Sequence, residues 1–452
     1  MERALAQARP TVAKLVLPRQ GLGVWPAPQL GRRTASSAAP RGDRVVAAAN
    51  ATALVVGGGF SGLAAAKVLC DSGVDVLLVD QGRMLGGRMC SRIATLPDTN
   101  ERVSFDYGCQ YLTARSPQFT AVLDRLRADN ATAVWGAGGS VGTAQLAADG
   151  GVDMATYKAD DKKELIVGLP HNAAVGRALA SLAGPRLTTL SATRVEELTW
   201  DGARSNWRCT VRTGEAGRSH SGAEVATVNR LKSASFDMVI SAMSAVSTAR
   251  LLGCSRGAGG GVLAPEAVAA ASDIAANCCW SVMVALRRKI DLPFDGALLS
   301  KPAPGPDGLP QYGPISWLAR DSSKPGRHPV GGGEGEAWVI QGGPSWSNAH
   351  RDASPEEAAK LLLAEFSKLA QVPIGPQDVL HLEAFRWNNA YALNPRPPTP
   401  PQLSSAPKVP LEGHFMLRPE LRFAACGEWC KGPRAGDAYM TGWEAAHALL
   451  QL

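Results

Sequence analysis

The stretch that decides the fold is ALVVGGGFSGLAAAKVLCDSG, Ala53–Gly73, in which three consecutive glycines separate an apolar run from an alanine-rich one. Glycine weakens strands and helices because it loses much backbone entropy on folding and offers no side chain to pack. Residues 53–56 predict a strand, the residues up to Ser72 predict a helix, and residues 74–79 predict a second strand. We therefore expect a βαβ unit whose two strands pair in parallel.

The glycines fit the pattern GxGxxG at Gly57, Gly59 and Gly62. The first permits a tight turn, the second lets a diphosphate approach the backbone, and the third lets the helix pack closely on the strand. Free N–H groups and the dipole at the start of the helix favour an anion there. Asp80 ends the second strand, where its carboxylate can accept hydrogen bonds from ribose hydroxyls. Together these residues predict a dinucleotide-binding site.

The composition of the chain excludes several other classes. Its 452 residues, 45% of them hydrophobic, suffice for two or three domains. The net charge of +7 is uneven, because residues 1–44 hold eight basic and two acidic side chains, which leaves about +1 for the rest. We expect no basic groove for nucleic acid. No apolar run reaches the roughly 18 residues of a membrane-spanning helix.

The nine cysteines are odd in number and show no CxxC or Cys/His spacing. This pattern favours reduced thiols, with neither disulfides nor a metal site.

Residues 1–50 are rich in arginine and poor in acidic residues, and they contain no secretory apolar core. This composition predicts a transit peptide, with a plain disordered tail as the alternative. We expect the chloroplast as the destination, and the mitochondrion remains open.

Beyond Asp80, Gly86-Gly87-Arg88 resembles the GGR motif of the flavin-containing amine oxidase superfamily, in which the arginine contacts the FAD diphosphate. The stretch FDYGCQYLTARSPQF, 105–119, resembles the signature FDxGAQYFTARxPxF of the renalase-like branch of that superfamily. Further matches are VGLPHNAAVGRALA from 167, CWSVMVALRRKIDLPFDGA from 279, SWLARDSSKPGR from 316, FRWNNAYALNP from 385 and GEWCKGPRAGDAYMTGWEAA from 427. The resemblance covers residues 51–452. The chain departs from the family at Cys109, where alanine is usual, and at Glu428, where aspartate is usual.

The resemblance implies an α/β protein with a discontinuous Rossmann-type FAD-binding domain of the amine oxidase type and a second, substrate domain built on a mixed β-sheet. The expected segments are 1–50 for the transit peptide, 51–130, 171–255 and 411–452 for the FAD-binding domain, and 131–170 and 256–410 for the substrate domain. FAD is expected to bind noncovalently.

The expected cofactor-binding residues come from the glycine loop, the strand ends, the GGR motif and the C-terminal motif. They are Gly57, Gly59, Phe60, Ser61, Gly62, Asp80, Gln81, Gly87, Arg88, Val195, Gly427, Glu428, Met440 and Thr441. Glu428 would bind ribityl hydroxyls, and a final helix from about Ala438 would direct its N-terminus at the flavin, where reduction places negative charge.

Five side chains are candidates for the catalytic site. Gln110 and Tyr111 are expected to face the flavin, Trp280 and Trp387 to line a substrate pocket, and Arg386 to bind an anionic substrate group. For each of them a core aromatic or a surface polar residue is the alternative.

The resemblance implies a renalase-like oxidase. Its FAD would take a hydride from a dihydronicotinamide isomer or an amine and pass the electrons to O2, which gives H2O2. One alternative is a plastid flavin dehydrogenase or desaturase acting on an isoprenoid or a pigment. A second alternative is a noncatalytic FAD-binding protein.

Overall fold

The predicted βαβ unit is present at the start of the folded chain. The computed structural model describes residues 52–214, 221–257, 259–305, 308–395 and 411–452. Strand β1 (Thr52–Val56) leads through the glycine loop into helix α1 (Phe60–Asp71), and β2 (Asp75–Val79) then pairs with β1 in parallel. The predicted transit peptide, 1–50, lies outside the described residues.

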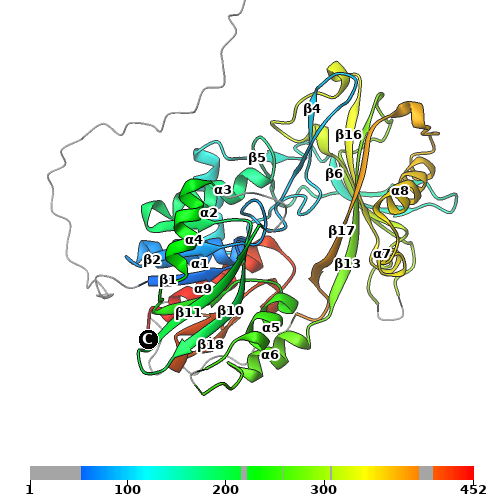
Figure 1. Cartoon of the computed structure of the whole chain (residues 1–452). Helices are drawn as coiled ribbons and strands as arrows, with labels where there is room; N and C mark the ends of the chain where they lie inside the picture. Colours follow the sequence, from blue (N-terminus) through cyan, green and yellow to red (C-terminus); the bar gives the residue numbers. More distant parts are fainter. Residues whose placement is uncertain (1–51, 215–220, 258, 306–307, 396–410) are drawn as a thin grey trace, which may run out of the picture. The chain divides into compact units, whose positions relative to one another are not determined.

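Four further strands complete a six-stranded sheet in the order β18-β19-β12-β1-β2-β9. They are β9 (Leu187–Leu190), β12 (Met238–Ser241), β18 (Met416–Arg418) and β19 (Phe423–Ala425). All neighbours in this sheet are parallel except β18 and β19. Because the strands come from distant parts of the sequence, the domain is discontinuous, which confirms the predicted fold class (Figure 1).

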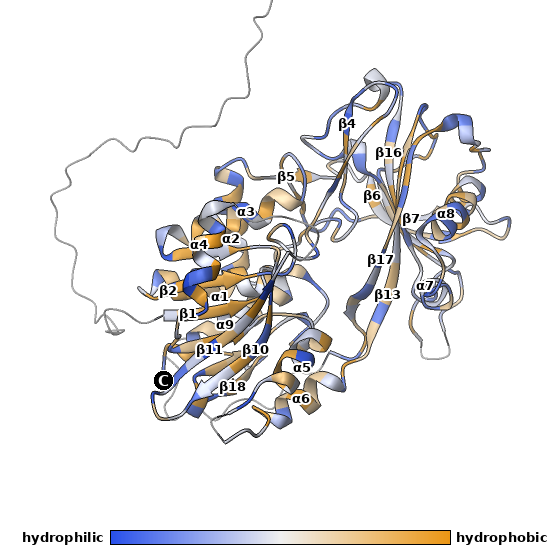
Figure 2. Ribbon diagram, viewed as in Figure 1, coloured by the Kyte–Doolittle hydropathy of each residue, from blue (hydrophilic) through white to orange (hydrophobic). Residues whose placement is uncertain are grey.

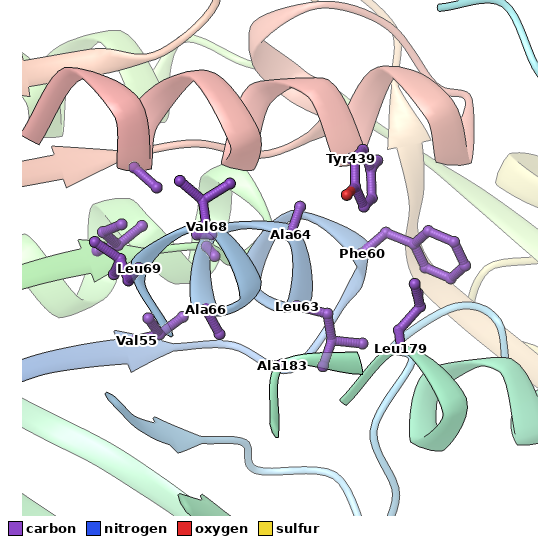
Figure 3. Packing of buried hydrophobic residues seen from close by; sticks show 14 of the residues in the cluster. Val55, Phe60, Leu63, Ala64, Ala66, Val68, Leu69, Leu179, Ala183 and Tyr439 are labelled. Carbon is purple, nitrogen blue, oxygen red and sulfur yellow. The ribbon is translucent and has the colours of Figure 1, made fainter. Parts of the chain in front are cut away.

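Helix α1 packs against the last helix, α9 (Ala435–Leu449), and both helices contact this sheet. A side-chain carbon at Gly442 of α9 would overlap the carbonyl of Ser61, so the two helices touch backbone to backbone. The small residues of α1 permit this contact, and Ala64, Ala65 and Ala66 are fully buried. Figure 3 shows Phe60 and Tyr439 at one end of the packed layer, with Leu179 beside them. Hydrophobic residues concentrate in these elements (Figure 2).

A second sheet of seven strands has the order β17-β13-β16-β15-β14-β6-β7. Its strands are β6 (Val141–Leu146), β7 (Val152–Ala159), β13 (Ala276–Leu286), β14 (Gly296–Ser300), β15 (Ile315–Arg320), β16 (Glu336–Gly342) and β17 (Val379–Ala392). The β6–β14 pair is parallel and the other pairs are antiparallel, so the sheet is mixed, as predicted. Helix α8 (Pro355–Leu369) covers one face, where Phe366 packs on Trp338.

The remaining elements connect or cover the two sheets. The helices are α2 (Pro117–Ala128), α3 (Ala173–Leu182), α4 (Gly222–Leu231), α5 (Ala245–Cys254), α6 (Pro265–Ser272) and α7 (Pro344–Ala349). The strands are β3 (Arg92–Thr95), β4 (Arg102–Phe105), β5 (Thr132–Trp135), β8 (Leu165–Gly168), β10 (Thr193–Asp201) and β11 (Asn206–Thr213). Short 3-10 helices cover Gly184–Arg186, Asp321–Ser323, Gly331–Gly333, Pro376–Asp378, Pro419–Leu421 and Glu428–Cys430. Among the described residues, no helix combines the length and apolar character needed to span a membrane.

The final helix begins three residues earlier than predicted, at Ala435. Gly436 concealed this start in the sequence, because glycine is a poor helix former. In the structure Gly436 packs against the Phe119 ring, and Asp437 lies in the first turn, where the helix dipole favours its charge. Met440 and Thr441 therefore lie inside the helix rather than at its end.

Candidate functional site

The three glycines of the loop meet different surroundings. Gly57 has φ +109°, and a side-chain carbon there would lie 2.5 Å from the carbonyl oxygen of Ala242. A side-chain carbon at Gly62 would overlap the carbonyl of Gly57. At Gly59, by contrast, it would meet nothing within 4 Å. The fold itself requires Gly57 and Gly62, whereas Gly59 borders open space.

The same open space lies at the start of α1. Gly59 is the N-cap residue, with no side chain capping the helix and no acidic residue in its first turn. The first hydrogen bond within the helix runs from the Leu63 N–H to the Gly59 carbonyl, so the N–H groups of Phe60 and Ser61 have no partner inside the helix. The buried Phe60 and Ser61 side chains pack into the protein. This end of the helix can bind an anion.

Asp80 is tied to the glycine loop. One of its carboxylate oxygens accepts the Gly58 N–H at 2.5 Å, and the other accepts the Gly82 N–H at 2.6 Å. Burial raises the pKa of Asp80, against the effect of these two hydrogen bonds. Each oxygen keeps capacity for a further donor. The neighbouring Gln81 is exposed.

The structure brings the GGR motif to the same place. A side-chain carbon at Gly87 would lie 3.2 Å from the Cα atom of Gly59. The Arg88 guanidinium forms a two-pronged ion pair with Glu428, with Nη1 donating to Oε1 at 2.9 Å and Nη2 lying 2.6 Å from Oε2. Arg88 also donates to the Ala390 carbonyl at 2.8 Å. Two predicted cofactor residues, 340 positions apart, are thus direct partners.

The C-terminal motif joins this site through α9. The Gly427 N–H donates to the Thr441 hydroxyl at 3.1 Å, and that hydroxyl lies 3.4 Å from the Ser61 hydroxyl. Met440 and Thr441 are buried. Val195 is buried in β10, whose start contacts the end of β2 through a hydrogen bond from the Thr193 N–H to the Asp80 carbonyl.

Residues 106–111 form a turn that lies against the GGR motif. The Cys109 N–H donates to the Arg88 carbonyl at 2.8 Å, and a side-chain carbon at Gly108 would overlap that same carbonyl. Gln341 of β16 donates from Nε2 to the Gly108 carbonyl at 2.8 Å. The turn therefore connects the GGR motif with the seven-stranded sheet.

The Gln110 side chain, which was predicted to face the flavin, is buried and hydrogen-bonded within the protein. It is 7% exposed, and its Nε2 donates to the carbonyls of Asp106 and Gly108. Its Oε1 accepts from the Lys324 ammonium at 3.3 Å. The tight turn has carbonyl groups that need donors, and the Gln110 amide supplies them.

Two aromatic side chains belong to this region, Tyr111 within the turn and Trp387 in contact with it. The Tyr111 ring contacts Trp317 at 5.6 Å between centroids, and burial raises the pKa of Tyr111 to about 12. Trp387 stacks on Tyr107 at 5.3 Å and donates from Nε1 to the Tyr107 carbonyl at 3.0 Å. Both are half-buried aromatic side chains, and Trp387 lies beside Gly108, where a side-chain carbon would lie 3.3 Å from its ring.

Trp280, which was predicted to line a substrate pocket with Trp387, and Arg386, which was predicted to bind an anionic substrate group, do not lie at this turn. In the β13–β17 register Trp280 opposes Arg386, while Cys279 opposes Trp387. Side chains alternate between the faces of a sheet, so the first pair lies on the opposite face from Trp387. Trp280 is buried in the core beneath α8, and Arg386 lies over its ring at 5.6 Å.

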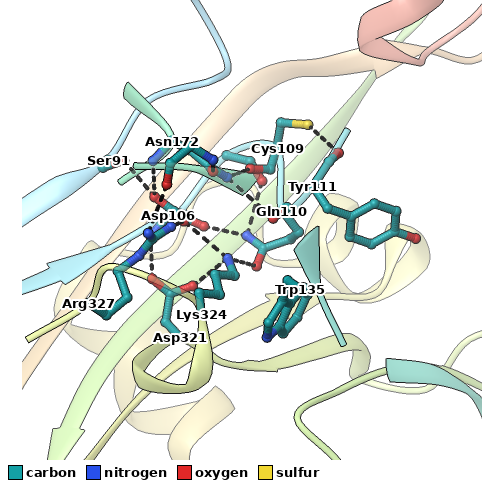
Figure 4. A network of polar contacts seen from close by, with 12 residues as sticks. Ser91, Asp106, Cys109, Gln110, Tyr111, Trp135, Asn172, Asp321, Lys324 and Arg327 are labelled. Carbon is teal, nitrogen blue, oxygen red and sulfur yellow. Dashed lines mark hydrogen bonds and ion pairs between the residues drawn. The ribbon is translucent and has the colours of Figure 1, made fainter. Parts of the chain in front are cut away.

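Sequence reasoning missed a buried charged cluster behind the turn, formed by Asp106, Asp321, Lys324 and Arg327 (Figure 4). Asp106 lies in FDYGCQY, and the other three lie in SWLARDSSKPGR. Charged residues inside these motif stretches were the available signal. Burial alone would raise the pKa of Asp106, but Lys324 and Arg327 outweigh it and lower the pKa to about 2.

Two other features do not define the site. A cavity of about 530 Å³ lies between the 146–150 turn, residues 301–303 and 311–315, and α8, and it contains none of the predicted site residues. Within the described part of the chain, Glu412, His414 and Glu444 place three possible metal ligands together. The Lys431 ammonium lies 3.4 Å from the His414 ring nitrogen, so a cationic group already contacts this cluster.

Comparison with known proteins agrees with this class of fold. Residues 55–126 match the family model of the NAD(P)-binding Rossmann-like domain. The chain is 44% identical over 75 residues to (S)-6-hydroxynicotine oxidase of Paenarthrobacter nicotinovorans, a match that covers 16% of this chain and 17% of that protein. The sequence match thus spans about a sixth of this relative.

Solved structures extend the likeness to most of the chain. Cyclohexylamine oxidase of Brevibacterium oxydans IH-35A has a TM-score of 0.55 at 13% identity, over 89% of this chain and 99% of that one. Putrescine oxidase has a TM-score of 0.55 at 11% identity, over 88% and 98%. A candidate protoporphyrinogen oxidase of Exiguobacterium sp. 255-15 has a TM-score of 0.56 at 10% identity, over 88% and 98%.

The fold is a Rossmann-type α/β domain, part of which matches the NAD(P)-binding Rossmann-like family model, with a second domain on a mixed sheet. More particularly, the chain has the fold of the amine oxidases.

Proposed function

We propose that this protein is an FAD-dependent oxidoreductase, a renalase-like oxidase acting on a small reduced substrate. The observation that carries the proposal is the open space at Gly59, beside the uncapped N-terminus of α1. Asp80 and Gly87 border the same loop through direct contacts. A bare backbone, free N–H groups and a carboxylate at the end of β2 fit a dinucleotide.

The residues of the site fit FAD. The N–H groups of Phe60 and Ser61 would hold its diphosphate, and Asp80 would accept from the adenosine ribose. The Arg88 guanidinium has five donors, and its contacts with Glu428 and Ala390 leave capacity for a phosphate oxygen. Glu428, which Arg88 fixes in place, would accept from ribityl hydroxyls.

Bound FAD would supply the redox chemistry, by taking a hydride from the substrate and returning electrons to O2 as H2O2. The protein supplies position and exclusion of water. The Gly108 backbone is held against Arg88 and Gln341, the half-buried Trp387 ring lies beside it, and the half-buried Tyr111 ring follows three residues further along the chain. Such aromatic surfaces suit a flat ring or a small amine.

The substrate class rests on the motif resemblance over residues 51–452 and on the relatives. The matched relatives include oxidases of hydroxynicotine, cyclohexylamine and putrescine, all of them small molecules by name. We propose a dihydronicotinamide isomer or a small amine as the electron donor.

The test is the visible spectrum of the purified full-length protein, followed by anaerobic mixing with reduced nicotinamide isomers and with amines. A flavin spectrum that one donor class bleaches, with H2O2 formed when air is readmitted, is the expected result. A flavin that no donor bleaches would favour the noncatalytic alternative. Protein that stays colourless after incubation with FAD would overturn the proposal.

We also propose that residues 1–50 direct the protein to the chloroplast, on their composition alone. A fusion of residues 1–50 to a fluorescent protein tests this proposal. Fluorescence that remains in the cytosol, or that enters mitochondria, would contradict it.

A further inference from the structure

The buried charged cluster behind the turn joins two separate parts of the chain. Asp106 is the first residue of the turn, whereas Asp321, Lys324 and Arg327 follow β15. Asp106, Asp321 and Lys324 are fully enclosed, and the Arg327 side chain is almost so. Two cations face two anions, so the cluster is neutral overall (Figure 4).

Lys324 is the centre of the cluster. Its ammonium lies 2.5 Å from the Asp321 carboxylate, 3.2 Å from Asp106 and 3.3 Å from the Gln110 Oε1. It also lies 5.1 Å from the centre of the Trp135 ring. The lysine thus uses its donors on two carboxylates and one side-chain amide.

Stability alone is a weak reason for such a cluster. Removing charges from water costs about as much as their attraction returns, and well-packed apolar side chains often stabilise a protein equally well. A charged group does, however, fix which way a neighbouring hydrogen-bonding side chain points, and an apolar side chain cannot do this. One neighbour of the cluster needs its orientation fixed in this way.

That neighbour is Gln110, whose side-chain amide could point either way in its slot. An ammonium only donates, so the Oε1 atom must face Lys324, and the Nε2 atom must then face the carbonyls of Asp106 and Gly108. The Gly108 carbonyl receives a second donor, the Nε2 atom of Gln341. Both lone pairs of this carbonyl are thereby engaged, and the next N–H, on Cys109, donates to Arg88.

We propose that Lys324 is a positioning residue: it orients Gln110, and Gln110 fixes the Gly108–Cys109 peptide against the GGR motif where the cofactor binds. This inference rests on the proposed function, because the position of the turn matters for binding only if FAD lies beside the turn. Asp106 and Asp321 then hold the lysine in place, and Arg327 balances the second carboxylate.

The test is a double-mutant cycle with Lys324→Met and Gln110→Met, measured on the full chain by FAD affinity and by the visible circular dichroism of bound FAD. Each single variant should weaken FAD binding about tenfold and change the dichroism in the same way. The double variant should bind FAD no more weakly than either single variant, because both substitutions break the same contact between Lys324 and Gln110. Additive losses, or unchanged dichroism in both single variants, would overturn the proposal.

Two controls separate position from charge. The double variant Lys324→Met with Asp321→Asn restores neutrality of the cluster but leaves Gln110 without its donor. The dichroism of FAD bound to this variant should therefore stay altered. Full recovery of the dichroism would show that charge alone matters and would overturn the proposal. Arg287→Met removes an exposed cation paired with Asp98 and should leave both measurements unchanged.

The outcomes remain distinct from those of the proposed function. Should Lys324→Met fail to fold, Gln110→Met decides alone, because it removes no charge, and an unaltered dichroism in that variant overturns the proposal. Wild-type protein that binds no FAD overturns the proposed function and this inference with it. Wild-type protein that binds FAD, with variants that match it, overturns only this inference.

Discussion

Replacing Gly59 by valine should separate the folding of the site from its ability to bind FAD. A side-chain carbon at position 59 meets nothing within 4 Å, and the backbone there, at φ −75° and ψ −175°, suits any residue. Reduced entropy of the unfolded chain and the poorer helix cap act in opposite directions, each by about 0.5–1 kcal/mol. The free energy of unfolding of the ligand-free protein should therefore change by less than about 1 kcal/mol.

FAD affinity should fall steeply in the same variant. The valine carbons would fill the space beside the N–H groups of Phe60 and Ser61, so the diphosphate would lose at least those two hydrogen bonds. A hydrogen bond to a charged group contributes about 1.5–3 kcal/mol, and the loss is about 3–6 kcal/mol. This corresponds to a rise of about 10²–10⁴-fold in Kd.

The assay pairs urea denaturation of ligand-free protein with titration of FAD, followed by quenching of flavin fluorescence. Gly253→Ala is the matched control, since a side-chain carbon there also meets nothing within 4 Å and the residue lies in α5. It should keep wild-type FAD affinity. The reasoning is refuted if Gly59→Val binds FAD as the wild type does, or if it loses several kcal/mol of stability without ligand.

Three further outcomes are expected. Gly62→Ala should destabilise the ligand-free protein by several kcal/mol or abolish soluble expression, because its methyl group would overlap a backbone carbonyl of the loop; a folded variant with wild-type melting temperature would contradict this. Arg88→Met should cost about 2 kcal/mol in urea denaturation, because it leaves the carboxylate of the buried Glu428 without its cation while Arg88 itself is a third exposed. Adding Glu428→Met should recover part of that loss, and a larger loss in the double variant would count against a direct pair. Asp106 has a lowered pKa, so its stabilising contribution is complete above about pH 4 and is lost as the pH falls from 3.8 toward 2. The difference in unfolding free energy between wild type and Asp106→Asn should accordingly shrink by about 2 kcal/mol across that range, and a pH-independent difference would rule this out.

The glycine loop could be predicted from sequence because the residues that determine it are close together in the chain. Gly57, Gly59 and Gly62 lie within six residues, and their strand and helix adjoin them, so spacing alone indicates the turn and the helix start. Asp80 follows in the same way from the end of the next strand. The Rossmann-type fold rests on this segment.

Side-chain directions in the second domain could not be predicted, because they depend on pairing between distant segments. The sequence shows that Trp280 and Trp387 are aromatic residues near motif stretches, but only the β13–β17 register assigns them to opposite faces. Gln110 turns inward because of Lys324, which lies 214 residues further along the chain. No local pattern carries that information.

The close contact between α1 and α9 has a consequence for biosynthesis. The glycine loop and α1 are synthesised hundreds of residues before α9, against which α1 packs. Pairings across such separations close slowly. A nascent chain therefore exposes the apolar surface of α1 that α9 covers until α9 has left the ribosome, and we expect it to engage chaperones up to that point.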